Sequence, residues 1–299
     1  MTMKVIRPVT VTDSMLISST ASEPGTGEVA WNGATAYTAG QRVIRAATHR
    51  VYERIVPGTS ATAPESDAVN WLDVAPTNRW AMFDTQISTA TEVTSPLTVT
   101  LAPGPINAVA LLDLVGSEVT VTVTDGAGGP TVYTSTVDLD DSTVLDWYQY
   151  VWEPFAQLTE AIFTDIPTYA AARVIVSLTG DTVSCGTMVV GSTYSIGDVY
   201  GTPALGIIDY SRKTTDEFGV TTFVQRAFRK KLGVDMTMPM AQFAAAYKIL
   251  ASLRATPCVW QTSQDPALSP LTVYGFFNDF SITVAYRSHV LCALSIEGL

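Results

Sequence analysis

The chain has 299 residues, of which 47% are hydrophobic and only 15% charged, and its formal net charge is −11. Ordinary soluble proteins carry roughly a quarter charged residues, so Thr, Ser, Ala and Gly must form much of this surface, which suits a protein that neighbours cover. Seventeen basic against 28 acidic residues argue against nucleic acid as the main partner, because phosphate backbones need clustered Lys and Arg. A compact monomer with few charges is the alternative.

Two further classes are disfavoured by local patterns. The sequence contains no run of about 18 apolar residues, so no membrane-spanning helix is predicted. The first 16 residues lack the continuous apolar core of a secretory signal. The three cysteines, Cys185, Cys258 and Cys292, are widely spaced and odd in number. We therefore expect buried free thiols in a protein made in a reducing cytoplasm.

Residues 1–29 predict an N-terminal arm. An alternating strand over residues 5–11 is followed by a loop over residues 19–27 that is rich in Ser, Thr, Gly and Pro. Such an arm has no core of its own and must pack on its own chain or on a neighbour. We expect it on a neighbouring chain or protein.

Residues 30–75 form a unit with a distinct aromatic rhythm, made by Trp31, Tyr37, Tyr52 and Trp71. Short β segments are expected between these aromatics, with turns that contain glycine or proline. A unit of roughly 45 residues can bury only a small core, so the large aromatic side chains must supply most of it.

Residues 77–190 read as many short strands. The segment 118–124 alternates Val and Thr with the period of a half-buried antiparallel strand, and a Gly-rich turn leads into a returning strand over 131–137. This spacing predicts a jelly-roll-like β-sandwich. The other strands are expected at residues 98–101, 106–114, 173–178 and 185–190.

Residues 191–299 predict a β-rich domain of the α+β type with one packed helix. The helix is expected over residues 240–254, because Pro239 precedes an apolar face at helical spacing and Pro257 follows it. The strands are expected around residues 206–210, 221–226, 271–276, 280–286 and 289–296. The whole chain is therefore predicted to be mainly β.

Residues capable of catalysis are scarce, and we expect no catalytic residues, no metal and no cofactor. The chain has two histidines. His49 lies between strands of the aromatic unit, whereas Ser288 and His289 are adjacent and, in a strand, would point to opposite faces. No short motif of a nucleotide-binding loop, a metalloprotease or a serine hydrolase is present. A glycosidase with two carboxylates is the enzymatic alternative.

Two clusters of charged residues could each be a binding site or a solvated surface segment. The acidic loop with Asp138, Asp140, Asp141 and Asp146 could hold Ca²⁺ through oxygen ligands, but it lacks the spacing of an EF-hand, and a solvated turn is favoured. The basic run formed by Arg226, Arg229, Lys230 and Lys231 is interpreted as a solvated strand or turn.

The aromatic unit resembles the small chitin-binding modules of carbohydrate-binding families 5 and 12. The resemblance is carried by Trp31, the segment 35–41, Val43, Tyr52, Pro64 and Trp71. It implies that Trp31 and Trp71 build the module core. The sugar-stacking Trp of these families tends to lie two residues before the proline, where this chain has Thr62.

This departure favours a rigid spacer or interaction block over a sugar-binding module, since a Thr side chain cannot stack on a pyranose. Tyr37 and Tyr52 are then the remaining candidates for a sugar-binding face. Packing in the module core is the alternative for both.

Modules of this kind also occur in bacteriophage tail and fibre proteins. The segment 77–84 and the strands after it resemble galactose-binding-like sandwiches of phage tail proteins, and residues 191–299 resemble ring-forming tail-tip domains. Together these resemblances imply a tail-tip or baseplate (minor tail) protein, made in the bacterial cytoplasm and located in the virion. It would assemble as a trimer or hexamer with other tail proteins. The alternatives are an adhesin that binds host surface polysaccharide and an accessory module of a chitin-degrading enzyme.

Overall fold

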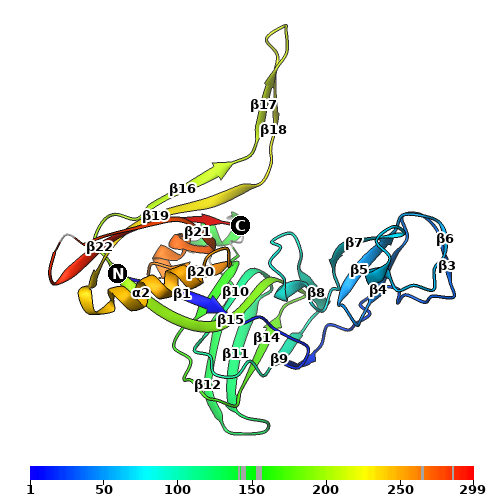
Figure 1. Ribbon diagram of the computed structural model, residues 1–299, viewed down its shortest axis with the longest axis horizontal. Coiled ribbons are helices and arrows are strands. Elements are labelled where there is room, and N and C mark those ends of the chain that lie inside the picture. The colour runs from blue at the N-terminus through cyan, green and yellow to red at the C-terminus, as the bar shows by residue number, and fades with distance from the viewer. Residues whose placement is uncertain (141, 143–145, 153–156, 264–265, 285) are drawn as a thin grey trace. The chain divides into compact units, whose positions relative to one another are not determined.

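The computed structural model describes residues 1–140, 142, 146–152, 157–263, 266–284 and 286–299 (Figure 1). The fold is mainly β, with 52% strand and 10% helix, as the sequence predicts. The chain forms two compact units, one from Val9–Val190 and one from Met1–Pro8 with Gly191–Leu299. The chain passes from one unit to the other between Pro8 and Val9 and again between Val190 and Gly191.

The larger unit, Val9–Val190, contains the sandwich and the aromatic module. Its elements are β2 (Leu16–Ser19), β3 (Ala36–Tyr37), β4 (Arg42–Arg45), β5 (Arg50–Arg54), β6 (Gly58–Thr59), η1 (Pro64–Ser66), β7 (Trp71–Pro76), η2 (Ala81–Phe83), β8 (Thr91–Thr94), β9 (Leu97–Leu101), β10 (Ala108–Val115), β11 (Glu118–Asp125), β12 (Thr131–Asp138), α1 (Trp147–Trp152), β13 (Glu160–Phe163), β14 (Ala172–Thr179) and the first part of β15 (Thr182–Val199).

The smaller unit contains the two chain ends. Its elements are β1 (Thr2–Pro8), the rest of β15, β16 (Ala204–Asp209), β17 (Arg212–Thr215), β18 (Thr221–Val224), β19 (Phe228–Pro239), α2 (Met240–Ser252), β20 (Cys258–Gln261), η3 (Pro266–Leu271), β21 (Thr272–Thr283) and β22 (His289–Gly298).

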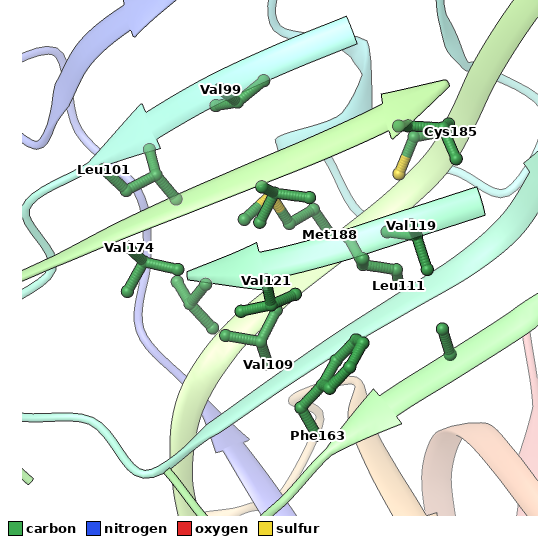
Figure 2. Packing of buried hydrophobic residues seen from close by; sticks show 14 of the residues in the cluster. Val99, Leu101, Val109, Leu111, Val119, Val121, Phe163, Val174, Cys185 and Met188 are labelled. Atoms are coloured by element: carbon green, nitrogen blue, oxygen red, sulfur yellow. The ribbon is translucent and has the colours of Figure 1, made fainter. Parts of the chain in front are cut away.

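Two facing sheets enclose the main core of the larger unit. One sheet has the order β12-β11-β14-β9-β2, and the other contains β13, β10, β15 and β8. Figure 2 shows side chains of both sheets, such as Val99 and Val121 from one and Val109 and Met188 from the other, gathered in one apolar cluster. Burying each such aliphatic side chain contributes about 1.5–3 kcal/mol to stability, so this cluster is what holds the sandwich together.

The alternation of Val and Thr in β11 shows how the sequence selects its face. Val119, Val121 and Val123 are fully buried in the core. Thr120 lies on the opposite face, where its hydroxyl is 2.9 Å from that of Thr136 on β12. The period-two pattern therefore orients the strand as expected, with a hairpin partner in β12.

The N-terminal arm folds on its own chain, so the expectation that it lies on a neighbour is wrong. In the smaller unit β1 is an inner strand, paired with β15 on one side and β20 on the other. Met3 and Val5 are fully buried there. The physical reason is that alternating apolar residues in β1 fill a position of this sheet that would otherwise have two open edges.

Helix α2 covers one face of the smaller unit's sheet. Its side chains Ala246 and Leu250, with Leu253 just after it, share a core with Val234 on β19 and Leu294 on β22. The helix begins where expected and ends at Ser252, slightly before residue 254, with Leu253 as its C-cap. Ala255, with a φ of 54°, has already left the helical conformation.

Two strands are longer than the sequence suggested. β15 runs over 18 residues, and the division between the units falls within it. β21 is one strand where two were expected, because a bulge between Phe277 and Asp279 restores the pairing with β22 after a break in the alternation.

The pairing of β1 with β15 gives a direct test of this arrangement. A Cβ added at Gly191 would lie 1.9 Å from the carbonyl oxygen of Arg7, whereas a Cβ at Gly206 would meet nothing within 4 Å. We expect Gly191→Ala to lower the free energy of unfolding by about 1–3 kcal/mol, as overpacking does. Gly206→Ala, the same change in another strand, should be close to neutral. Urea denaturation measures both, and equal stabilities would contradict the inner position of β1.

Candidate assembly interface

A long β-hairpin of the smaller unit is the most unusual surface of the molecule. We call residues 204–231 the hairpin. At its base β16 pairs with β19 from Ala204↔Gly233 to Asp209↔Phe228, and at its tip β17 pairs with β18. Figure 1 shows these strands extending away from the sheet of their own unit.

The tip is closed by a turn that its sequence dictates. The Asp216 carboxylate accepts hydrogen bonds from the backbone N–H groups of Phe218 and Val220, at 2.9 and 2.8 Å. Gly219 adopts a φ of 79°, which glycine reaches without steric cost. An Asp at the start and a Gly near the end are the residues that such a turn requires, so the hairpin is locally encoded.

The side chains of the hairpin are exposed on both faces. From residue 204 to 228, every residue except the half-buried Ile208 is exposed. Phe218 at the tip is 91% exposed and Phe223 is 72% exposed. The other large apolar side chains exposed here are Leu205, Ile207, Tyr210, Val220, Val224 and Phe228. A two-stranded ribbon cannot bury such side chains by itself.

An open hollow of about 370 Å³ lies where the base meets the tip. Its apolar lining comes from Ile207, Phe223 and Phe228, and Arg226 adds a cation. The opposite charge is Asp209, whose pKa is lowered by its hydrogen bonds from Ser211. An apolar depression with a few charges is the form in which a partner's side chain is received.

The hairpin is basic although the chain is acidic. It carries six basic residues, Arg212, Lys213, Arg226, Arg229, Lys230 and Lys231, and three acidic ones, Asp209, Asp216 and Glu217. Arg226 and Lys231 of the basic run are exposed, as expected of a solvated strand or turn, and Arg229 and Lys230 are half-buried. Sequence reasoning missed the apolar side chains around this run, because periodicity places residues on a strand but does not show whether that strand has a core to cover.

A second exposed apolar surface was also missed. In the short helix α1 of the larger unit, Trp147, Tyr148, Val151 and Trp152 are all exposed. Tyr148 and Trp152 are four residues apart and so share one face of the helix. The aromatic density of the segment 147–152 was the available signal.

The module residues are placed in its core rather than on a sugar-binding face. Tyr37 and Tyr52 are 3% and 5% exposed and pack with Val43 and Trp71. The rings of Tyr37 and Trp71 meet edge to face with centroids 5.2 Å apart. Of the two roles that the sequence left open for the tyrosines, burial favours core packing, because a buried ring offers no face to a pyranose.

Trp31 lies at the margin of this core, and a cation covers its ring. The Arg45 guanidinium is 4.8 Å from the ring centroid of Trp31 and donates two hydrogen bonds to the Glu65 carboxylate. These bonds are the main reason that the pKa of Glu65 is lowered. The guanidinium therefore covers one face of the Trp31 ring.

His49 joins the module to segments that precede and follow it. Its Nδ1 is 2.9 Å from the Glu23 carboxylate, and its Nε2 is 2.7 Å from that of Asp13. The Glu23 carboxylate also accepts a hydrogen bond from the Thr77 hydroxyl, and the imidazole stacks on Trp80. This histidine therefore has a structural role as a connector.

The other histidine corrects an expectation. Ser288 Oγ and His289 Nδ1 are 3.0 Å apart, so the expectation that these side chains point away from each other is wrong. Strand alternation does not apply, because β22 begins only at His289. Among the described residues, no carboxylate that bonds the His289 imidazole appears.

The acidic loop is described in part, whereas all three cysteines are described. Within the described ranges, no three His, Cys, Asp or Glu side chains could hold a metal ion. The Asp140 carboxylate instead accepts a hydrogen bond from the Ser142 N–H, which lowers its pKa, while Asp141 lies outside the described residues. All three cysteines are free and buried, as predicted.

Comparisons with known proteins give no identification. No family model matches the chain, and no curated protein is similar to it. The described part of the chain also contains no helix with the length and hydropathy needed to cross a bilayer.

The buried thiols lead to a chemical prediction. Burial raises the pKa of Cys185 and Cys258 to about 12 and that of Cys292 to about 11. At pH 8 only on the order of one Cys185 side chain in 10,000 is then a thiolate, the reactive form. We expect a thiol reagent to label the folded protein hardly at all and the denatured protein at all three cysteines. Rapid labelling of the folded chain would contradict this burial.

The buried tyrosines lead to a binding prediction. Calorimetric titration with chitin oligomers should give dissociation constants above about 1 mM, or no heat. Without a stacking face, the binding free energy should be less favourable than about −4 kcal/mol. Tighter binding that Tyr37→Phe and Tyr52→Phe leave unchanged would show that another surface of the module binds sugar.

Proposed function

We propose that this protein is a non-enzymatic structural component of a larger assembly and that the hairpin is the element with which it binds its neighbour. The single observation that carries this proposal is the row of exposed apolar and aromatic side chains on a ribbon with no core. An exposed apolar surface of this kind marks an interaction site, and an uncovered one favours aggregation.

The composition supports the same conclusion. With 15% charged residues, the chain has few charges to solvate its surface, and the exposed aromatics of α1 add a second surface for a neighbour to cover. A structural role also agrees with the chemistry of the site, because its Phe, Tyr and Arg residues are those enriched in interface cores.

We further propose a bacteriophage tail tip or baseplate as the setting. The support is the resemblance of the module at residues 30–75 and the mainly β fold. In that setting the module, whose aromatic residues form its own core, acts as a rigid spacer or interaction block. The adhesin alternative would need a sugar-binding face, which the buried Tyr37 and Tyr52 do not provide.

A photo-cross-linking experiment tests the proposed function. The photoreactive residue p-benzoylphenylalanine is incorporated in place of Phe218 in cells that assemble the complete particle, and the particle is purified and irradiated. We expect a covalent adduct between this position and a protein of the particle, because the tip must be buried in the assembly. The matched control is the same probe in place of Val69, an exposed side chain of the module.

An adduct formed from position 218 but not from position 69 is the expected result. The proposal fails if position 218 forms no adduct, or if the protein is missing from the purified particle. It also fails if both positions react equally, since the hairpin would then be no more than another exposed surface.

A further inference from the structure

We propose that the neighbour bound by the hairpin is a second copy of this chain and that the hairpin lies on the open face of the sheet in that copy's smaller unit. This inference rests on the proposed function and names the partner. It follows from how charge is divided along the chain and from which sheet face is left uncovered.

The charges are divided between the hairpin and the rest of the chain. The hairpin has a formal charge of +3, whereas the other 271 residues carry 11 basic and 25 acidic side chains, a charge of −14. A cationic element on a strongly anionic body is attracted to the body of another copy. The same anionic body repels a phosphate backbone, so the basic and aromatic residues do not favour a nucleic acid.

The smaller unit has a sheet face to receive the hairpin. Helix α2 and the core lie on one side of β19, β22 and β21, where Met236, Cys292 and Ile282 point. On the opposite side the paired residues Asp235, Ala293 and Ser281 lie in a row across the three strands, and all three are exposed. The exposure of all three side chains shows that this row is open to solvent, although Gly201 lies beside Asp235 at its margin.

This open face complements the hairpin in side-chain size and in charge. Its small side chains, Ala293, Ser281 and the neighbouring Ser295, leave room for the large rings of a ribbon such as Phe223. Asp235 and Asp279 are exposed and place two carboxylates on it, while Lys231 and Glu297 pair across the strands at one end of the same face. Arg212, Lys213 and Arg226 of the hairpin are the complementary cations. Apolar contact at the centre with charges at the margin is the usual anatomy of an interface.

The contact joins two different surfaces, so each copy can give its hairpin to one neighbour and receive the hairpin of another. Such a heterologous contact produces a closed ring when the rotation between copies closes and an open chain when it does not. The inferred contact therefore yields assembly rather than only a dimer.

Charge reversal of the two surfaces tests the inference with the full chain. One variant carries Arg212→Glu, Lys213→Glu and Arg226→Glu, and the other carries Asp235→Lys and Asp279→Lys. We expect the unmodified protein to self-associate in sedimentation velocity at low salt and less so at high salt, because salt screens exposed charges. Each variant alone should self-associate about tenfold or more weakly, which corresponds to about 1.4 kcal/mol.

Restoration is the decisive part. In a mixture of the two variants, every hairpin can meet a face of opposite charge. The same is true of a single chain that carries all five changes. Both should therefore regain association. The control variant carries Asp125→Lys and Asp165→Lys, two exposed acids of the larger unit, and should associate like the unmodified protein. Circular dichroism confirms that every variant is folded.

The outcomes separate this inference from the proposed function. A monomeric unmodified protein, or reversal without restoration, overturns the inference. If the probe at position 218 then forms adducts only with a different protein of the particle, the hairpin is still an assembly element, with another partner. If the probe forms no adduct, the proposed function falls as well.

Discussion

A two-stranded ribbon has two faces and no interior, so it cannot bury large side chains of its own. The hairpin exposes Phe218, Phe223 and Phe228 together with aliphatic side chains, although each would contribute more stability if it were removed from water. Its local order comes from the Asp216 turn and from strand pairing, neither of which covers a ring. In the proposed function, these exposed side chains are the ones through which the protein binds its neighbour.

The rest of the smaller unit supplies the anchor for this ribbon. β19 begins at Phe228 in the hairpin and continues into the sheet, where Leu232, Val234 and Met236 are buried. Because one strand belongs to both, a force on the hairpin base is transmitted to a packed core. The inner position of β1 adds to this core and ties the N-terminus into the same unit. The larger unit has its own sandwich core, and the module within it has a separate aromatic one.

The sequence predicted well which face of a strand is buried, because alternation is a local property. The face of β11, its turn into β12 and the start of α2 follow from residues that are adjacent in the chain. The partner of β1 could not be predicted, since it depends on strands almost 200 and more than 250 residues away. The Ser288–His289 contact was missed because Ser288 precedes β22, so the alternation of side chains along a strand does not set its direction. The roles of Tyr37 and Tyr52 stayed open because an aromatic side chain suits both a core and a sugar face. The hairpin's basic residues were recognised, but their exposure depends on the absence of a packing partner, which no local pattern encodes.

Hydrogen–deuterium exchange of the hairpin in the free chain and in its assembly tests the central claim most directly. In the free chain, the backbone amides of residues 212–224 should exchange rapidly, since only one ribbon ladder protects them. In the assembly, the account predicts strong slowing of exchange over this segment, with little change in the already protected core strands. Equal exchange of residues 212–224 in the two states would contradict the claim that this hairpin is buried against a neighbour.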